Sequence, residues 1–448
     1  MWYLLYNCLL LLVSPVILLI LLAKQRCRRG LLQRLGLRAE TPASEPAGKS
    51  GCIWIHAVSL GEVVAVAPLV RDLRRRYPEA RLIVSTVTET GREAVEQRLE
   101  GVAEHRYAPL DFPWVVNQAI DRLKPSLYVF VETELWPNLL RSLRRRNVPS
   151  ILVNGRLSTR SFERQRLPVI RDFYRTMLNM ISCCLMQSER DAQRMIKLGA
   201  EPSRVRCTGN IKFDQPVPQA AGGMVLSKAS LGLTDAEQLL VAGSTHPGEE
   251  EAIVNAYQAL SPEFPDLRLV LAPRHIERAA QVEEMIKAKG LTVARRSTGG
   301  KEPMAGMGAP VLVLDTRGEL ALLYRDAVVA FVGGTLAPVG GHNLLEPAAW
   351  GKPVLFGPHT DHCAEVAALL VNAQGGRVVQ HEQDLAQSLR ELLLDHDALR
   401  RMGQAAQQVV ADNQGALQRS ADIIATFFPG REASNEALVE QRRELSSR

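Results

Sequence analysis

Glu62 lies at a position where a carboxylate could act as a general base. It ends the motif Ser59-Leu60-Gly61-Glu62, which follows the apolar run 52–58 and opens an amphipathic stretch. A carboxylate at the end of a buried strand can take up a proton near neutral pH when burial raises its pKa. The same Ser-x-x-Glu spacing is also a capping box at a helix N-terminus. On spacing alone, the cap is the favoured interpretation.

A second acidic candidate consists of Glu132 and Glu134, directly after the apolar run 126–131. Two carboxylates at the end of a strand cost free energy unless they are solvated, paired or functional. Alternatively, they are acids favoured by the dipole of the next helix, with Pro137 in its first turn. The sequence leaves both interpretations open.

The segment 333–346, GGTLAPVGGHNLLE, is rich in glycine and follows another apolar run. Glycines let a backbone approach an anion, and a following helix N-terminus offers free N–H groups. Glu346 could then bind ribose hydroxyls. Alternatively, this is a turn in which Asn343 and Glu346 cap a helix. The two Gly-Gly pairs favour phosphate binding, although neither a Walker loop nor Gly-x-Gly-x-x-Gly is present.

Two basic residues also follow apolar runs. Arg274 lies in Ala-Pro-Arg-His after residues 267–271, and Lys212 lies in Gly-Asn-Ile-Lys-Phe-Asp. Either could hold a phosphate or carboxylate, although a surface arginine near a helix start explains Arg274 equally well. His359 and His362 lack a nearby acidic cluster that would complete a metal site. We therefore predict neither a metal nor a cofactor.

These residues need elements that bring them together, and the chain alternates strand-like with helix-like stretches. The alternation breaks at residues 211–236, which contain prolines and glycines, and then restarts. Such alternation predicts parallel α/β sheets, with ligands bound beyond the carboxyl ends of the strands. We expect two doubly wound domains facing a cleft, at 51–210 and 237–428, joined by a linker at 211–236 and followed by a polar tail at 429–448.

Residues 1–23 carry no charged side chain. The first part of the linker 24–50, residues 24–39, contains six basic residues and no acidic residue. About 20 apolar residues suffice for a helix to span a bilayer, and the basic cluster marks the cytoplasmic side. We expect residues 1–23 to be a membrane anchor, either transmembrane or monotopic, with the domains on the cytoplasmic side. Trp2, Tyr3 and Tyr6 would lie at the membrane interface.

The composition fits an ordinary globular protein. Hydrophobic residues make up 46% and charged residues 23% of 448 residues, which excludes a disordered, collagen-like or coiled-coil chain. Residues 40–210 contain 26 basic and 19 acidic residues, and residues 211–448 contain 22 and 29. The basic front half could suit nucleic acid, but anionic lipid beside the anchor is the simpler partner. The seven cysteines include no Cys-x-x-Cys, which is typical of free thiols.

Six motifs taken together resemble one family, the 3-deoxy-D-manno-octulosonic acid (Kdo) transferases of Gram-negative lipopolysaccharide synthesis. They occur in the family's order and cover nearly the whole chain except the tail. They are HAVSLGE (56–62), VETELWPN (131–138), GNIKFD (209–214), APRH (272–275), DTRGEL (315–320) and GGHNLLEPA (340–348).

The resemblance implies a GT-B fold, with two Rossmann-like domains and an inverting, metal-independent reaction at the inner membrane. Kdo would pass from CMP-Kdo to the 6′-hydroxyl of the tetra-acylated lipid A precursor. Glu62 would be the general base, and Glu132 and Lys212 would stabilise the transition state. The residues implied to hold CMP are Pro273, Arg274, Arg317, Gly318, Glu319, Asn343, Leu344, Leu345 and Glu346.

Two other functions remain as alternatives. The chain could be another membrane-associated GT-B glycosyltransferase that uses a UDP-sugar, or a catalytically inactive membrane scaffold. Binding of CMP rather than UDP-sugars would distinguish a Kdo transferase from the first alternative. A scaffold would have no need of the set Glu62, Glu132 and Lys212.

Overall fold

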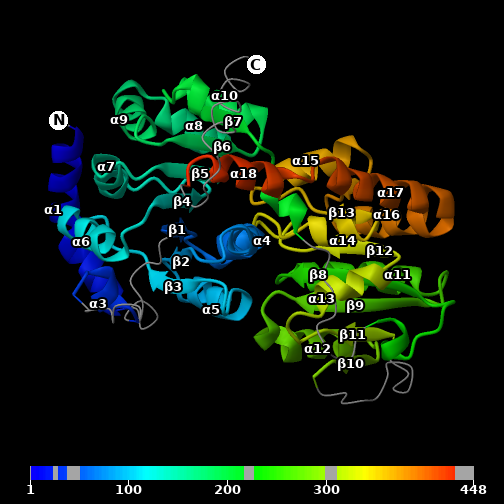
Figure 1. The fold of residues 1–448 in the computed structure, drawn as a ribbon. Helices are drawn as coiled ribbons and strands as arrows, with labels where there is room; N and C mark the ends of the chain where they lie inside the picture. The colour runs from blue at the N-terminus through cyan, green and yellow to red at the C-terminus, as the bar shows by residue number, and fades with distance from the viewer. Residues whose placement is uncertain (1, 24–28, 38–50, 216–226, 298–309, 429–448) are drawn as a thin grey trace. The chain divides into compact units, whose positions relative to one another are not determined.

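The computed structural model describes residues 2–23, 29–37, 51–215, 227–297 and 310–428. The chain forms two compact units (Figure 1). Unit 1 comprises Met1–Gln215 and Gln414–Arg448, and unit 2 comprises Pro216–Asn413. The predicted basic linker lies mostly, and the predicted polar tail entirely, outside the described residues.

The sheet of unit 1 has seven strands in the order β3-β2-β1-β4-β5-β6-β7, and each neighbouring pair is parallel. The chain therefore builds the sheet outward in one direction from β1 and then in the other direction from β4. The strands are β1 (Cys52–His56), β2 (Arg81–Thr86), β3 (Glu104–Tyr107), β4 (Leu127–Val131), β5 (Ser150–Gly155), β6 (Cys183–Met186) and β7 (Val205–Cys207).

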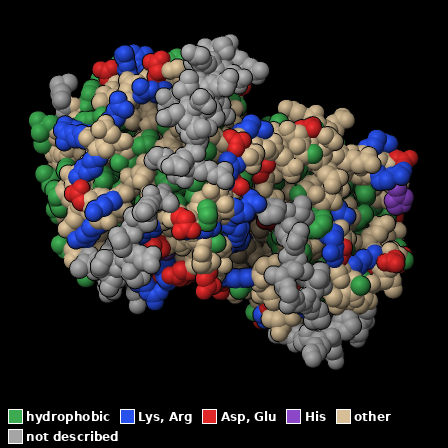
Figure 2. All heavy atoms as spheres, viewed as in Figure 1, with side chains coloured by type: hydrophobic (Ala, Val, Ile, Leu, Met, Phe, Trp, Pro, Cys, Tyr) green, Lys and Arg blue, Asp and Glu red, His purple; other side chains and the backbone are tan. Residues whose placement is uncertain are grey.

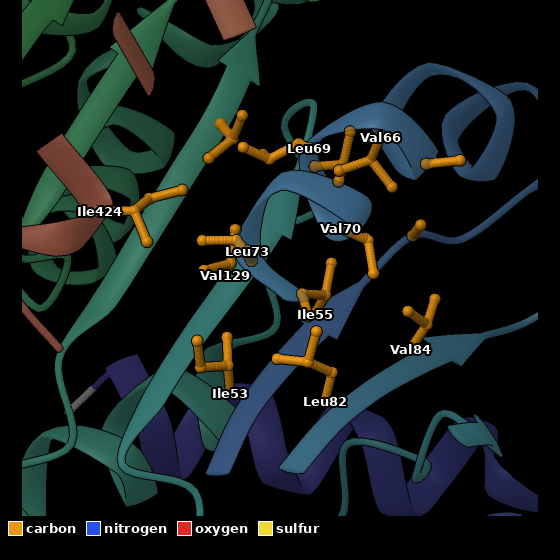
Figure 3. Packing of buried hydrophobic residues seen from close by; sticks show 14 of the residues in the cluster. Ile53, Ile55, Val66, Leu69, Val70, Leu73, Leu82, Val84, Val129 and Ile424 are labelled. Atoms are coloured by element: carbon orange, nitrogen blue, oxygen red, sulfur yellow. The ribbon is translucent and has the colours of Figure 1, made fainter. Parts of the chain in front are cut away.

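Helices cover both faces of this sheet, because successive strand residues point to opposite sides. Ile53 and Ile55 of β1 pack on one face against α4 (Figure 3). Trp54 packs on the other face. The helices are α1 (Trp2–Ala23), α3 (Leu31–Arg34), α4 (Leu60–Arg76), α5 (Glu89–Arg98), α6 (Pro113–Leu123), α7 (Pro137–Arg145), α8 (Thr159–Gln165), α9 (Pro168–Leu178), α10 (Glu189–Lys197) and α18 (Ala416–Ala425), with short 3-10 turns η1 (Pro202–Arg204) and η2 (Ile211–Asp214).

Unit 2 repeats this architecture with the strand order β10-β11-β9-β8-β12-β13-β14, again parallel throughout. Its strands are β8 (Gln238–Thr245), β9 (Leu267–Pro273), β10 (Val293–Arg295), β11 (Val311–Val313), β12 (Val329–Val332), β13 (Val354–Phe356) and β14 (Gly376–Val378). Its helices are α11 (Glu249–Leu260), α12 (Ala279–Ala288), α13 (Leu320–Leu323), α14 (Leu345–Ala349), α15 (Ala364–Asn372), α16 (Glu382–Leu394) and α17 (His396–Asp412), with η3 (Ala229–Leu231), η4 (Ile276–Arg278) and η5 (Tyr324–Asp326). The two doubly wound α/β domains predicted from the sequence are confirmed.

The C-terminal helix α18 belongs to unit 1, which corrects the boundary predicted at residue 428. Ile424 packs into the core around Leu69 and Leu73 of α4 (Figure 3). The carboxylate of Asp214 accepts hydrogen bonds from the N–H groups of Gly415, at 2.5 Å, and Leu417, at 2.7 Å. A negative charge at a helix N-terminus is favourable. Of the predicted linker 211–236, residues 211–215 belong to unit 1 and residues 227–236 to unit 2, and residues 216–226 lie outside the described residues.

Helix α1 lies against unit 1 by one face. The Tyr6 hydroxyl donates to Asp111 at 3.0 Å, and Asn7 and Asn138 exchange side-chain hydrogen bonds. Tyr3 donates to the Met180 sulfur at 3.1 Å. These contacts place the hydroxyls of Tyr3 and Tyr6 against unit 1. Among the described residues, no helix has both the length and the apolar character needed to cross a membrane.

Replacing Asp214 by alanine is expected to destabilise unit 1. The change removes both acceptors from the start of α18, and losing a cap typically costs about 0.5–2 kcal/mol. Urea denaturation followed by tryptophan fluorescence would measure the free energy of unfolding. The matched control is Asp422→Ala, which breaks an ion pair of α18 with Arg76 at a half-exposed site and should cost less than about 1 kcal/mol. Equal effects of the two substitutions would contradict the capping role.

Candidate active site

The acidic candidates of unit 1 lie where the chain begins to add strands to the other side of the sheet. Strands β1 and β4 are neighbours, and the chain leaves them toward opposite edges of the sheet. The carboxyl ends at such a switch point are the usual place for a ligand in an α/β sheet. Glu62 follows β1 and Glu132 follows β4. The structure thus places the two predicted acids at one edge of neighbouring strands.

Glu62 is held in the first turn of α4 by two hydrogen bonds. Its Oε2 accepts from the N–H of Val58 at 2.8 Å, and its Oε1 accepts from the Ser59 hydroxyl at 3.1 Å. Ser59 is the N-cap residue, yet its side chain accepts no hydrogen bond from the helix. The capping box is therefore only half formed. The glutamate side chain accepts a backbone N–H, and that N–H belongs to the residue before the N-cap.

Burial raises the pKa of Glu62 from 4.5 to about 7. Its side chain has little contact with solvent, so the charged form loses hydration. The negative charges of Glu132 and Glu134 add to this rise, whereas the hydrogen bonds from Val58 and Ser59 oppose it. A carboxylate with a pKa near 7 is suited to take up and release a proton at neutral pH.

Glu132 forms an ion pair with Lys212, with 3.1 Å between Oε1 and Nζ. Glu132 has a positive φ of 58°, a conformation that non-glycine residues rarely adopt. The backbone of Glu132 still donates to the carbonyl of Val153 at 2.9 Å, which keeps it at the strand end. The structure therefore brings together Glu132 and Lys212, and the negative charge of Glu132 contributes to the raised pKa of Glu62.

Lys212 is positioned by the backbone of η2. Asn210 caps this turn by accepting from the Lys212 N–H at 3.0 Å, and the Asn154 side chain accepts from the N–H of Ile211 at 3.1 Å. Asp214, at the end of the same turn, caps α18. The Gly-Asn-Ile-Lys-Phe-Asp motif thus orients one lysine and also attaches the C-terminal helix.

The residues predicted to hold a nucleotide lie at the corresponding edge of unit 2. Pro273 ends β9, the stretch 317–319 follows β11, and the stretch 343–346 follows β12. Strands β11, β9, β8 and β12 are consecutive in the sheet, so these segments share its carboxyl edge. The side chains of Arg274, Arg317 and Asn343 are exposed. Glu319 pairs with Arg296 at 3.1 Å.

Asn343 and Glu346 form the cap pair that the sequence left as an alternative. The Asn343 amide donates to Glu346 at 3.2 Å, and its oxygen accepts from the N–H of Leu345 at 3.2 Å. The side chains of Leu344 and Leu345 are buried. These two leucines can therefore meet a ligand only through their backbone.

The two Gly-Gly pairs do not form the phosphate cradle that the sequence favoured. The N–H of Gly334 donates to the Glu249 carboxylate, as do those of the next three residues, at 2.7–3.1 Å. The N–H groups of Gly340 and Gly341 both donate to the carbonyl of Gly334. A side chain at Gly333 would lie 2.5 Å from the Ser244 carbonyl, so this glycine permits close backbone packing. An internal carboxylate occupies the place expected for an anion.

Sequence reasoning missed a histidine cluster at the same edge of unit 2. His246 follows β8, and its Nε2 lies 2.8 Å from Nε2 of His342, in the loop after β12. The ring of His275 lies 5.7 Å from that of His246. A histidine directly after a strand, here in Thr-His-Pro-Gly, was the available signal. Among the described residues, no group of three or more His, Cys, Asp or Glu side chains is arranged to hold a metal ion.

Replacing Glu62 by glutamine is expected to flatten the pH dependence of stability. Because the folded-state pKa is raised, Glu62 favours folding most below pH 4.5, and this contribution is lost as the pH rises toward 7. The loss amounts to about 3 kcal/mol, and the neutral glutamine avoids it. Urea denaturation at pH 5 and pH 8 measures the difference. The exposed Glu79→Gln is the control, and a wild-type pH dependence in Glu62→Gln would contradict the raised pKa.

The chain matches the family model described as "3-Deoxy-D-manno-octulosonic-acid transferase (kdotransferase)" over residues 29–215. It is 36% identical over 433 residues to the 3-deoxy-D-manno-octulosonic acid transferase of Haemophilus influenzae, covering 96% of this chain and 99% of that protein. The Bordetella pertussis enzyme of the same name is 33% identical, with 88% and 90% covered. The fold resembles the S. aureus MnaA–UDP complex, with a TM-score of 0.57, 16% identity, and 84% and 96% covered. The GT-B fold predicted above is confirmed, and the chain belongs to the Kdo transferase family of glycosyltransferases.

Proposed function

We propose that this enzyme transfers Kdo from CMP-Kdo to the 6′-hydroxyl of a tetra-acylated lipid A precursor, with inversion and without a metal ion. The observation that carries the proposal is the buried Glu62, whose pKa is raised to about 7 and which lies beside the Glu132–Lys212 pair. A hydroxyl acceptor needs a base of this kind, because an alcohol must lose its proton as it attacks.

The reaction needs one proton transfer and one displacement. The Glu62 carboxylate takes the proton of the acceptor hydroxyl while the oxygen attacks the anomeric carbon of Kdo. The bond to the CMP phosphate breaks on the opposite face, which inverts the configuration. Lys212 stabilises the negative charge that develops during this step, and Glu132 orients the lysine through the 3.1 Å ion pair. A fixed lysine can supply this electrostatic role without a metal.

Unit 2 would bind the CMP portion of the donor. The exposed side chains of Arg274 and Arg317 lie at the carboxyl edge of its sheet, where they can reach phosphate or base. Glu346 can accept hydrogen bonds from ribose hydroxyls while Asn343 holds it at 3.2 Å. The backbone of Pro273, Gly318, Leu344 and Leu345 would complete the site, with Glu319 held by Arg296.

The direct test is a mass-spectrometric assay with CMP-Kdo and the tetra-acylated lipid A precursor in detergent and EDTA. Wild-type enzyme is expected to add the mass of one or more Kdo residues. Glu62→Gln and Lys212→Met should each lose about 10²- to 10⁴-fold in rate. Because Glu62 acts deprotonated, the wild-type rate should rise with pH through about 7 and then level off.

Glu79→Gln is the matched control, because this exposed glutamate precedes β2 at the amino edge of the sheet, opposite the carboxyl ends, and should keep the wild-type rate. No mass increment from a folded wild-type protein would overturn the proposal. Transfer from UDP-sugars instead would support the alternative glycosyltransferase. Unchanged activity of Glu62→Gln would remove the base from the mechanism.

We also propose that α1 attaches the enzyme to the cytoplasmic face of the inner membrane as a monotopic anchor. The polar residue Asn7 and the hydroxyls of Tyr3 and Tyr6 face the protein, so the apolar side of α1 is left exposed. Figure 2 shows hydrophobic side chains gathered at this edge of unit 1. The exposed side chains on α1 include Leu4, Leu5, Leu9, Leu11, Leu12, Val16 and Leu19. Large exposed apolar patches mark membrane or protein interaction sites, and this one would lie against the bilayer surface.

Cosedimentation with vesicles of phosphatidylethanolamine and phosphatidylglycerol tests this anchor. The wild type is expected to sediment with the vesicles. Leu5→Glu combined with Leu12→Glu should weaken binding at least about tenfold, because each leucine contributes roughly 1.5–3 kcal/mol on burial. Leu394→Glu changes an exposed leucine of unit 2 and serves as control. Wild-type protein that stays in the supernatant, or a double variant that sediments equally, would contradict the anchor.

A further inference from the structure

The His246–His342 pair lies at the switch point of unit 2. Strands β8 and β12 are neighbours, and the chain leaves them toward opposite edges of the sheet. His246 follows β8 and His342 lies in the loop after β12. Glu62 and Glu132 occupy the equivalent position in unit 1. A pair of titratable rings therefore lies at the place in this sheet where ligands usually bind.

The two rings are held in a defined arrangement. Their planes are nearly parallel, with 6° between them, and their Nε2 atoms are 2.8 Å apart. A Cβ atom at Gly334 would lie 2.9 Å from the His342 ring, so this glycine leaves the space that the pair occupies. The N–H of His246 donates to Glu249 at 2.9 Å, which fixes its backbone.

The short Nε2–Nε2 contact limits the protons that the pair can hold. One Nε2 must donate its hydrogen and the other must accept it, because two protonated nitrogens would repel each other. The accepting ring then carries its own hydrogen on Nδ1, and the donating ring has a lone pair on Nδ1. Among the described residues, neither Nδ1 atom has a hydrogen-bond partner. A neutral pair thus offers one donor and one acceptor, whereas one added proton gives two donors and a positive charge.

The surroundings keep the empty pair neutral. Burial lowers the pKa of both rings, that of His342 to about 4. Arg274 and His275 act in the same direction on both, as does His362 on His342. The acids facing His246 are Glu249 and Glu250, but Glu249 accepts backbone N–H groups and Glu250 pairs with Arg278 at 2.8 Å. A bound anion would reverse this balance by favouring the protonated form.

We propose that His246 and His342 act as one proton-sharing pair that binds the anionic group of the sugar-nucleotide donor and takes up one proton when it does so. The proposal rests on the proposed function, because it assigns the donor to this edge of unit 2. The anion is the phosphate or the carboxylate of the donor. The pair is a binding and positioning element beside the residues that, by the family resemblance, would hold CMP. Its proton leaves again when CMP dissociates.

Isothermal titration calorimetry of CMP binding to the full chain tests the pair. Titrations in two buffers with different ionisation enthalpies give the number of protons taken up. We expect wild-type protein at pH 7 to take up close to one more proton per CMP than His342→Gln or His246→Gln. The ionisation of the nucleotide itself contributes equally in wild type and variants. The difference in proton uptake therefore measures the contribution of the histidine pair. The affinity of wild-type protein for CMP, divided by that of the variants, should rise up to about tenfold per pH unit as the pH falls.

His396→Gln is the matched control, since this exposed histidine begins α17 and should leave proton uptake unchanged. The double variant should resemble either single variant, because both singles destroy the same shared proton. Uptake with CMP but not with cytidine assigns the phosphate, and uptake only when Kdo is added assigns the carboxylate. Equal proton uptake in wild type and variants, both with CMP and with CMP plus Kdo, overturns the pair alone. Absence of CMP binding by active wild-type enzyme overturns the pair, and absence of both binding and activity overturns the proposed function too.

Discussion

Both units depend on the parallel pairing of their strands. A parallel strand requires a crossover back to the starting edge, so the carboxyl ends of all strands meet at one side of the sheet. Where the winding reverses, at β1–β4 in unit 1 and β8–β12 in unit 2, the loops separate and leave room for side chains. Glu62, Glu132, His246 and His342 all follow one of these four strands. The position of the chemistry is therefore a consequence of the winding.

The acid and base properties of the site arise from competing local forces. In Glu62, burial and the neighbouring acids oppose the two hydrogen bonds that favour the carboxylate, and burial prevails. The buried carboxylate of Glu249 accepts several backbone N–H groups, most of them from the loop after β12. Two glutamates at the starts of helices thus have different roles. One retains a proton near neutral pH, and the other holds a loop in place.

Much of the fold could be predicted from the sequence, because the central strands are short, apolar and buried on both faces. The strands β3, β10 and β14 carry a weaker sequence signal, because all four residues of β3 are partly exposed and the other two strands have three residues each. The candidate residues could be placed at strand ends for the same reason. The contact of Glu249 with residues 334–337 could not be predicted, because it joins segments about 85 residues apart. The return of α18 to unit 1 depends likewise on a distant contact with Asp214.

The position of α18 has a consequence for the order in which the molecule is made. Domains commonly fold as they leave the ribosome, the N-terminal one first. Here the core around Leu69 and Leu73 includes Ile424, which is synthesised after all of unit 2. The growing chain must therefore hold the first domain with an uncovered apolar face until α18 has been synthesised. A truncated polypeptide would keep that face exposed, which would make an incomplete product easy for quality-control proteases to recognise.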